Sequence, residues 1–455
     1  MSSPAELLSL LRQRGRLTAA ELRTALGISA PTLMRALRAA GTDVLPIGRG
    51  PRRSYAARRR LRGNAEPLPV YRIDAEGRLS EAGRLDLATP QGSALSWQGD
   101  MPWPRDALMR DGWFRGIPYL LRDLRPEGFL GRQFARRHAT LLQVPEDPRL
   151  WSDDDVLHAM SLVGADVGGD LLIGETACRL WLEARQADAT PLGEAPWSDY
   201  ERLAQEAMTN GRAGSSAGGE FPKFTALRLI EGQPAHVLVK FSGNDDSPGT
   251  RRWSDLLVCE SLAVTLSGEL HDITGTTTHC VQHAGRNFLE SVRFDRVGAH
   301  GRLPLCSWLA INEDWFGLPG RPWTEGAAQL HARRLIDADT RDAIERLWHF
   351  GRLIGNTDMH DGNLSFRPVS GTRFELAPVY DMLPMAWAPQ RGVELPLVRY
   401  EPPLPMPAQR DAWQAAASVA LRFWDLAAED RRITPEFRAI CSANAVHLRT
   451  LRTAA

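Results

Sequence analysis

The chain has 455 residues, of which 43% are hydrophobic and 24% are charged, and its formal net charge is zero. This length suffices for two to four domains with a substantial core, and the composition is typical of a soluble protein. No apolar run approaches the roughly 20 residues that a membrane helix needs, and the N-terminus lacks the apolar stretch of a signal peptide. We therefore expect a cytoplasmic protein without membrane contact, associated with the nucleoid if it binds DNA.

The five cysteines are spaced far apart and form no Cys-x-x-Cys pair. An odd number of scattered cysteines indicates reduced thiols rather than a disulfide framework or a structural zinc site. We expect most of them to be buried as small apolar groups. They are Cys178, Cys259, Cys280, Cys306 and Cys441.

The basic residues are distributed unevenly. Residues 1–62 contain thirteen arginines, no lysine and three acidic residues, which gives this part a charge of +10 and the remainder −10. Only two of the 55 basic residues are lysines, Lys223 and Lys240, and both lie within 18 residues. A coding bias towards arginine explains the scarcity. The two lysines then mark places that need a compact ammonium group, although two lysines can also fall together by chance.

The basic N-terminal part predicts three helices. Residues 4–14 carry leucines on one face. Thr18 and Glu21 form a capping box for a second helix, and Ser29 caps a third after a glycine-containing turn. A helix, a short turn and a helix are typical of the helix-turn-helix, whose second helix enters the major groove. The outward side chains of the third helix are Thr32, Arg35 and Arg38.

A basic wing follows these helices. Residues 44–47 and 54–56 can pair as a hairpin around residues 48–53, and four further arginines extend the cationic surface into the next linker: Arg58, Arg59, Arg60 and Arg62. Arginine contacts to phosphates give salt-dependent affinity, with base reading left to the third helix. We therefore interpret residues 1–63 as a winged helix-turn-helix DNA-binding domain. The alternative is a protein-interaction module with a solvated basic face. The wing residues expected at DNA are Arg49, Arg52 and Arg53.

Residues 64–200 predict an α+β subdomain that begins with a polar linker at residues 63–69. Its composition indicates no particular function. The expected strands cover residues 70–73 and 171–173, and the expected helices cover residues 129–142 and 153–162.

Residues 201–300 predict a phosphate-binding lobe that starts with a glycine- and serine-rich loop at residues 211–220. Backbone N–H groups approach phosphate oxygens closely where side chains are absent, although such a loop is more often a flexible connection. No Walker A sequence follows it. Strands are expected over residues 224–230, 235–241 and 288–296.

Lys240 lies at the end of one of these strands, where the phosphate-contacting lysine of a kinase lies. Glu260, on a helix expected over residues 256–266, can pair with it, as kinases require. The alternative for Glu260 is a solvated helix residue, and the alternative for Lys240 is a charge on an edge strand.

Residues 301–455 predict a helical lobe. A polar stretch between apolar segments holds Asp358, His360 and Asn363, and Asp381 follows after a short excursion. Phosphoryl transfer needs a carboxylate that orients the hydroxyl nucleophile and oxygen ligands for Mg²⁺, and these residues supply them in order. The alternative is a polar loop of turn-forming residues. Helices are expected over residues 324–335, 340–354 and 407–427.

Taken together, these motifs resemble the HipA family of serine/threonine kinases, the toxins of bacterial toxin–antitoxin pairs, over about residues 66–400. The resemblance implies an α+β fold, with a two-lobed HipA-like or phosphatidylinositol-kinase-like core preceded by the small winged helix-turn-helix domain. It is carried by Asp358-x-His360-x-x-Asn363, Tyr380-Asp381, Ser215 to Gly218, Arg293 to Arg296 and Leu124 to Gly128.

The resemblance also implies roles for the residues. Asp358 is the catalytic base or hydroxyl-orienting group, braced by His360, and Asn363 and Asp381 are the Mg²⁺ ligands. ATP is expected to contact Lys240, held by Glu260, the backbone at Val292 and Phe294, and the loop residues Ala217, Gly218, Gly219 and Glu220. The family's autophosphorylation serine aligns with Ser215, and Ser216 is its rival. A phosphoryl group there would repel ATP's phosphates and eject the loop.

Two departures from the family pattern concern the loop and the partners. The loop is longer before Lys223, so the role of this lysine stays open. The chain carries its own DNA-binding domain, as in the stand-alone subgroup, so the need for a separate antitoxin also stays open. We expect a homodimer. The expected substrate is a protein serine or threonine; an aminoacyl-tRNA synthetase is the family's best-known target.

Two other functions compete with a kinase. The first is a DNA-binding transcription regulator with an inactive kinase-like sensor domain. The second is a metal-dependent nuclease or phosphohydrolase, because Asp, Asn and His sites that hold Mg²⁺ also serve hydrolysis. This second function needs neither Lys240 nor a glycine loop.

Overall fold

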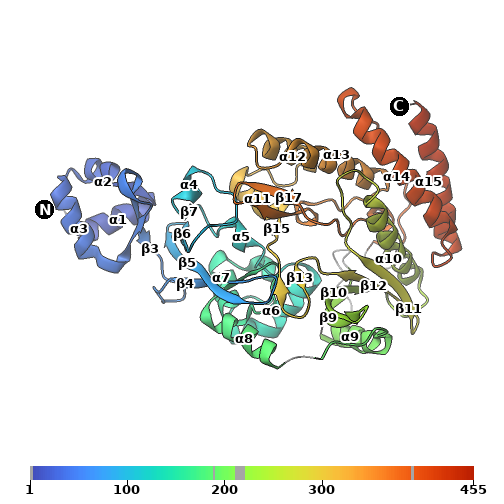
Figure 1. Cartoon of the computed structure of the whole chain (residues 1–455), viewed down its shortest axis with the longest axis horizontal. Helices are drawn as coiled ribbons and strands as arrows, with labels where there is room; N and C mark the ends of the chain where they lie inside the picture. Colours follow the sequence, from blue (N-terminus) through green and yellow to red (C-terminus); the bar gives the residue numbers. More distant parts are fainter. Residues whose placement is uncertain (1–3, 188–189, 211–220, 391–393, 455) are drawn as a thin grey trace.

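The computed structural model describes residues 4–187, 190–210, 221–390 and 394–454, and Figure 1 shows them as a small N-terminal module beside a large body. The module confirms the predicted elements. Thr18 and Glu21 form the capping box of its second helix, and Ser29 caps its third. Its elements are α1 Pro4–Arg14, β1 Leu17–Thr18, α2 Ala19–Leu26, α3 Ala30–Ala40, β2 Val44–Ile47 and β3 Ser54–Arg58.

The module shares a sheet with the body, which the sequence did not predict. Strand β3 pairs with β2 to form the expected hairpin, and its last residues also pair with Thr89 and Ala88 of β5. The sheet runs β1-β3-β5-β4-β8. The polar stretch after β3 is a tight turn bridged between Leu61 and Asn64, so it does not separate the module from the body.

The prediction of a free cationic surface at the end of the module is wrong for three of the four arginines. Arg58, Arg59 and Arg62 form ion pairs with carboxylates of the body, respectively Asp86, Asp154 and Asp155. Because these charges are neutralised within the chain, they fix the module on the body rather than present free cations.

The middle subdomain, residues 64–187, confirms the strands and helices expected there. Strand β4 lies between β5 and β8 in the sheet, and α6, α7 and α8 lie together on one side of the body (Figure 1). Its elements are β4 Leu68–Ile73, β5 Leu79–Thr89, β6 Ser93–Trp97, α4 Ala107–Arg110, β7 Trp113–Phe114, α5 Tyr119–Arg122, α6 Gly128–Leu142, α7 Asp153–Val163, β8 Leu171–Ile173 and α8 Glu175–Gln186.

A four-stranded antiparallel sheet, in the order β11-β12-β10-β9, forms the next lobe. Aromatic side chains of the sheet pack on Tyr200 of α9, and α10 begins earlier than expected because Ser247 caps it. The elements of this four-stranded lobe are α9 Trp197–Asn210, β9 Lys223–Ile230, β10 Gln233–Phe241, α10 Pro248–Ser267, β11 Thr278–His283 and β12 Arg286–Val292.

The strand expected over residues 288–296 ends earlier, at Val292. The chain then turns and enters the two-residue strand β13, because the charged side chains of Arg293, Asp295 and Arg296 are drawn into a buried ion network.

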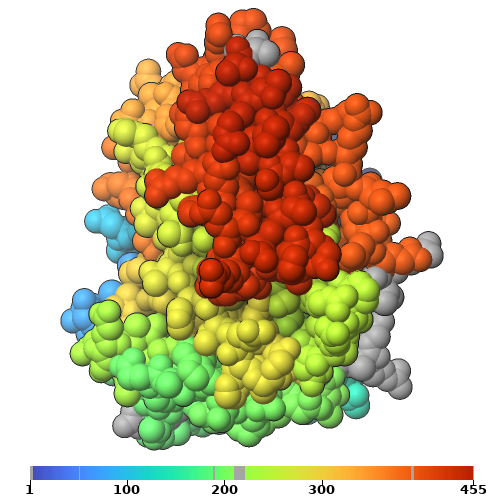
Figure 2. All heavy atoms as spheres, turned by 90° about the vertical axis from the view of Figure 1, so that its right-hand side faces the viewer, coloured from blue at the N-terminus to red at the C-terminus, as the bar shows by residue number. Residues whose placement is uncertain are grey.

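The helical lobe confirms the three expected helices, although α14 starts three residues late after a 3₁₀ turn at Pro407–Gln409. Figure 1 shows α14 and α15 side by side, and in Figure 2 the red atoms of the C-terminal part of the chain cover this end of the molecule. The elements are β13 Arg296–Val297, β14 Gly301–Arg302, β15 Cys306–Ser307, α11 Trp308–Trp315, α12 Trp323–Ala332, α13 Ala338–Leu353, β16 Ser365–Val369, β17 Arg373–Leu376, α14 Arg410–Glu429 and α15 Pro435–Ala454.

Two global expectations can be checked on the described residues. All five cysteines are free and buried, as predicted. Across the described ranges, no helix is both long and apolar enough to cross a bilayer.

Candidate active site

A buried lysine joins the four-stranded lobe to the helical lobe. The Nζ atom of Lys240 lies 2.6 and 2.8 Å from the two carboxylate oxygens of Glu260, and 2.5 Å from Oδ1 of Asp381. Lys240 and Glu260 are 4% and 2% exposed. One ammonium group therefore binds two carboxylates from different lobes, and the pairing of Lys240 with Glu260 predicted from the sequence is confirmed.

Local structure explains why these groups meet. Lys240 is the penultimate residue of β10 and pairs across the sheet with Leu289 of β12. Glu260 lies on the buried side of α10, which packs on the same strands. Asp381 has a φ of 56°, in the left-handed region that a short polar residue tolerates better than most others. A non-glycine residue held in this region is found more often at functional sites.

The charges of this cluster shift one another's titration. Burial lowers the pKa of Lys240, but Asp381 and Glu260 outweigh that effect and hold it above its usual value. Burial raises the pKa of Asp381, but the charges of Lys240 and Lys223 outweigh it and hold that pKa at about 2. Asp381 is therefore a carboxylate at neutral pH.

The second lysine of the chain belongs to the same site. Lys223 begins β9 and is the direct antiparallel partner of Lys240, so both side chains lie on one face of the sheet. Its charge also acts on Glu260 and Asp381. The two lysines, whose proximity in sequence was the clue, thus converge on one set of carboxylates.

The loop after α13 carries Asp358, an exposed residue. Asn356 fixes the loop by accepting a hydrogen bond from the N–H of Asp358 at 2.9 Å. The amide nitrogen of Asn363 donates to the carbonyl of Asp358 at 2.8 Å. Gly355, with a φ of 74°, lies so close to Trp387 that an added Cβ would be 2.4 Å from its ring. This catalytic-loop candidate is held by its own side chains.

His360 and Asp361 also hold the loop. The Nδ1 atom of His360 accepts a hydrogen bond from the N–H of Gly362 at 3.0 Å, which is the bracing role the sequence predicted. Asp361 was not assigned a role from the sequence. It is 4% exposed, and its Oδ2 accepts hydrogen bonds from Asn312 of α11 and from the N–H of Gly320. A buried carboxylate inside a short polar motif was the available signal.

Tyr380 connects this loop to Asp381. Its hydroxyl lies 2.6 Å from the carbonyl oxygen of Gly362 and 2.8 Å from Oγ of Ser365. The residue next to Asp381 is therefore tied to the residue next to Asn363. The hydroxyl of Tyr380 therefore links the two segments that carry the candidate metal ligands, Asn363 and Asp381.

The side-chain oxygen atoms of Asn363 and Asp381 are suitable ligands for Mg²⁺, which prefers oxygen ligands and keeps several bound waters. The amide nitrogen of Asn363 is used within the loop, and Lys240 contacts Oδ1 of Asp381, so the amide oxygen and Oδ2 are the atoms that a cation would use. The described residues contain no group of three or more His, Cys, Asp or Glu side chains placed to hold a metal. A two-ligand site completed by phosphate oxygens is compatible with that finding.

The comparisons with known proteins identify the family. The model of the HipA-like C-terminal domain matches residues 215–447, and that of the YjjJ-like toxin middle domain matches residues 64–182. The toxin YjjJ of Escherichia coli (strain K12) is 38% identical over 437 residues, which cover 96% of this chain and 95% of that protein. The chain belongs to the HipA-like toxin family.

One solved structure supports the fold of this HipA-like toxin, and a second is similar over only half of the chain. HipA of Shewanella oneidensis MR-1, in a complex with HipB and operator DNA, overlays on 85% of this chain and 96% of its own, with a TM-score of 0.51 and 15% identity. The Helicobacter pylori proinflammatory kinase CtkA covers 50% of this chain and 90% of its own, with a TM-score of 0.35 and 12% identity. The first of these likenesses confirms the predicted two-lobed α+β fold.

In this HipA-like toxin, part of the backbone that was expected to contact adenine already has hydrogen-bond partners within the chain. The N–H of Val292 donates to Thr277, and its carbonyl accepts a hydrogen bond from the Thr276 hydroxyl. Phe294 lies beyond the strand end, with its ring 5.7 Å from that of Tyr380. Of the two, Phe294 is the one whose side chain lies against the Tyr380–Asp381 corner.

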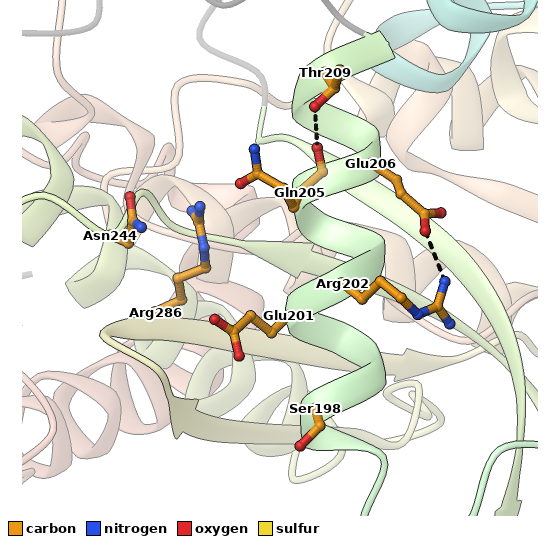
Figure 3. Close-up of a pocket in the computed structure, with 8 residues that line it drawn as sticks. All are labelled: Ser198, Glu201, Arg202, Gln205, Glu206, Thr209, Asn244 and Arg286. Carbon is orange, nitrogen blue, oxygen red and sulfur yellow. Dashed lines mark hydrogen bonds and ion pairs between the residues drawn. The ribbon is translucent and has the colours of Figure 1, made fainter.

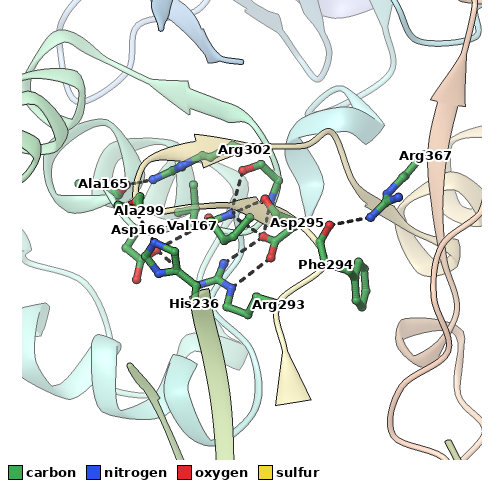
Figure 4. A network of polar contacts seen from close by, with 12 residues as sticks. Ala165, Asp166, Val167, His236, Arg293, Phe294, Asp295, Ala299, Arg302 and Arg367 are labelled. Carbon is green, nitrogen blue, oxygen red and sulfur yellow. Dashed lines mark hydrogen bonds and ion pairs between the residues drawn. The ribbon is translucent and has the colours of Figure 1, made fainter. Parts of the chain in front are cut away.

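A network of ion pairs between two arginines and two aspartates lies beside Phe294 (Figure 4). Asp295 binds Arg293 at 2.9 Å and Arg296 at 2.6 Å, and Arg296 reaches Asp166 of the middle subdomain at 3.1 Å. Arg367 of β16 donates to the carbonyl of Phe294 at 2.6 Å. The network therefore ties three parts of the chain together at the edge of the site.

A cleft of 1210 Å³ adjoins the lysine-bearing face of the sheet. Thr225 and Leu238, which neighbour the two lysines on that face, line one side, and residues 123–127, most of the sequence motif that begins at Leu124, line the other. Burial and Asp123 raise the pKa of Glu127, and His360 is among the charges that oppose this shift. Glu127 thus lies in the wall of this cleft, a placement that the sequence motif alone did not reveal.

A second cavity, of 500 Å³, lies on the outer face of α9 (Figure 3). It is lined by mutually neutralising side chains, including the ion pair of Arg202 with Glu206 at 2.8 Å. Arg286 on its far wall already donates to the carbonyl of Ser242. Because these side chains already bind one another or the backbone, we assign no function to this cavity.

The remaining predicted residues lie apart from this site. Arg35, Arg38, Arg49 and Arg53 are exposed on the N-terminal module, Thr32 accepts hydrogen bonds there, and Arg52 lies 3.9 Å from Asp111 of the body. The loop residues lie outside the described residues: Ser215, Ser216, Ala217, Gly218, Gly219 and Glu220.

Replacing Lys240 by Met should destabilise the protein by about 3–5 kcal/mol, because two carboxylates lose their buried partner. In wild type, ionised Asp381 stabilises the fold above pH 4, and this contribution is lost as the pH falls towards 2. Without Lys240, burial dominates and raises the carboxyl pKa values in the folded state. The variant's melting temperature should therefore rise between pH 8 and pH 5, measured in EDTA, while that of wild type changes little.

Lys223→Met is the matched control, since it makes the same change in a half-buried residue on the adjacent strand. At pH 8, Lys223→Met should lower the free energy of unfolding by less than Lys240→Met does. Equal losses in both variants, or no acid recovery in Lys240→Met, would contradict the assignment of Lys240 as the shared cation.

Proposed function

We propose that the chain is an ATP- and Mg²⁺-dependent protein serine/threonine kinase of the HipA toxin type. The observation that carries this proposal is the contact of Lys240 with Glu260 and Asp381 next to the loop of Asp358 and Asn363. A kinase needs a lysine for phosphates, a glutamate that orients it, and a carboxylate for the metal. Hydrolysis by a metal needs no such lysine, so the proposal favours transfer over hydrolysis.

The proposed reaction uses the residues in fixed roles. Lys240 and Lys223 bind ATP's phosphates, and Phe294 lies at the adenine end of the cleft. Asn363 and Asp381 would hold Mg²⁺, which when bound would neutralise charge on the phosphates. Asp358 orients the acceptor hydroxyl and takes its proton as the oxygen bonds to the γ-phosphorus and the bond to ADP breaks. His360 positions the loop through the N–H of Gly362.

We further propose that the kinase limits itself by phosphorylating Ser215, or Ser216, in the loop that covers the phosphates. A phosphoserine carries a charge of about −2 at the place where ATP's own phosphates bind, so the two repel each other. The modified loop then leaves the site.

The proposed domain order is a DNA-binding domain at residues 1–63, a middle subdomain at 64–200, an ATP-binding lobe at 201–300 and a catalytic lobe at 301–455. The HipA neighbour binds operator DNA with HipB. We propose that this chain contacts DNA through its own module, as a homodimer, whether or not a separate antitoxin acts on it. Its substrate is proposed to be a protein, of which an aminoacyl-tRNA synthetase is one candidate.

Incubation with Mg-ATP should add one phosphate to Ser215 or Ser216 of the wild type and none to Asp358→Ala or Asp381→Ala. Lys240→Ala should slow the transfer by roughly 100-fold or more, since it removes a preorganised charge from the transition state. The readout is intact-protein mass followed by phosphopeptide mapping, with the starting mass recorded before ATP is added.

A wild-type protein that starts unmodified and gains no phosphate would contradict the kinase and favour a DNA-binding regulator. Phosphate-ester or DNA hydrolysis that survives Lys240→Ala would favour the metal-dependent hydrolase. Both outcomes are read from the same protein preparations.

Arg35→Ala and Arg38→Ala should each weaken operator binding by roughly tenfold or more, because a base or phosphate contact is worth about 1–3 kcal/mol. Binding should also weaken steeply with salt as counterions rebind. Electrophoretic mobility shifts across a salt series measure both effects. Arg410→Ala, an exposed arginine at the start of α14, is the control. A response to salt that stays flat would rule out the electrostatic contact.

A further inference from the structure

A proline-rich segment, residues 394–406, exposes an unusual number of large apolar side chains. Leu395, Leu397, Leu404 and Met406 are 41%, 105%, 62% and 67% exposed. The remainder of the described chain exposes only seven other large apolar residues. Exposed apolar side chains that gather in this way mark an interaction surface more often than scattered ones do.

The segment is anchored, so its exposed leucines are held in place. The hydroxyl of Tyr400 donates to the carbonyl of Leu353 at 2.5 Å, and Trp413 donates to the carbonyl of Pro403 at 2.9 Å. The ring of Tyr400 packs against the rings of Trp387 and Trp424, with centroids 6.1 and 5.6 Å apart. Two buried anchors thus fix the backbone while the leucines on either side point to solvent.

A cavity of 150 Å³ separates the anchored segment from the catalytic loop. The loop contributes Gly355, Asn356 and Thr357 to its lining, and Thr357 directly precedes Asp358. Arg352, at the end of α13, also lines it and makes no ion pair with any residue that the structure describes. The surface is therefore continuous with the place where the acceptor hydroxyl would be held, and it carries one positive charge.

We propose that this docking surface, residues 395–406 with the adjoining cavity, binds an extended segment of the protein substrate. The segment would place an apolar side chain on the leucines, a few residues from the acceptor hydroxyl, and an acidic side chain opposite Arg352. The inference rests on the proposed kinase function and deepens it, because it names the kind of sequence that the kinase accepts.

The dimensions and charge favour a polypeptide over other occupants. A cavity of 150 Å³ is below the range that small-molecule ligands occupy, about 300–1,000 Å³, and suits one side chain. Nucleic acid backbones are held by several cations, whereas here Arg399 is paired with Glu401 at 2.7 Å. An extended chain advances about 3.3 Å per residue, so a short segment spans the cavity and the leucines.

The test uses a positional-scanning library of peptides with one serine, phosphorylated with Mg-ATP by the full-length protein. Wild type should prefer an apolar residue at one or two positions near the serine. Leu397→Ser combined with Leu404→Ser should remove that preference and lower kcat/KM by roughly tenfold or more, since one apolar contact discriminates by that factor. ATP affinity should not change.

Leu141→Ser combined with Leu150→Ser is the matched control, because both leucines are exposed, at 77% and 70%, in the middle subdomain. It should behave as wild type. Arg352→Glu should replace the preference for an acidic residue by one for a basic residue, a reversal that general damage to the fold cannot produce.

The results separate this inference from the proposed function. A kinase that modifies itself but phosphorylates peptides without apolar preference, or that is unaffected by the leucine changes, overturns the docking surface alone. If no phosphate is transferred at all, the kinase proposal fails, and binding of the same peptides to wild type and to the leucine variant decides the docking surface by itself. A loss of self-association in the leucine variant would instead identify an interface between two copies.

Discussion

The structure depends on one buried cation. Lys240 binds Glu260 from α10 and Asp381 from the helical lobe, so the two lobes meet at a single ammonium group. Burying Lys240 and Glu260 is costly unless each has a partner, and this geometry gives each of them one. The same cluster holds Asp381 ionised and fixes it in a left-handed backbone conformation. The proposed kinase function requires a site of this kind, which is held together by charge before phosphates and a metal bind.

Around that cation, the polar loop after α13 is positioned by groups that have no direct role in the proposed chemistry. Asp361 reaches α11, Tyr380 reaches the carbonyl of Gly362, and Asn356 holds the N–H of Asp358. The loop is therefore held both by its own side chains and by contacts from α11 and from Tyr380.

Local signals predicted much of this arrangement. The capping box at Thr18 and the pairing of Lys240 with Glu260 follow from neighbouring residues or from a strand and helix in succession, and both are present. Contacts between distant residues could not be predicted. The ion pair of Arg59 with Asp154 spans 95 positions, and the pairing of β3 with β5 depends on which edge of a sheet is open. The early end of β12 was missed for a similar reason, because the ion network of Arg293, Asp295 and Arg296 extends to Asp166 of the middle subdomain.

The central claim is that the Lys240 cluster binds the phosphates of ATP together with Mg²⁺. The most direct test is calorimetric titration of the full chain with a non-hydrolysable ATP analogue, with and without Mg²⁺, for wild type and for Asp381→Asn. The account predicts binding that is strengthened by Mg²⁺ in wild type, and an affinity in Asp381→Asn that no longer responds to the metal. Wild-type protein that binds no nucleotide, or binds it equally well in both conditions, would contradict it.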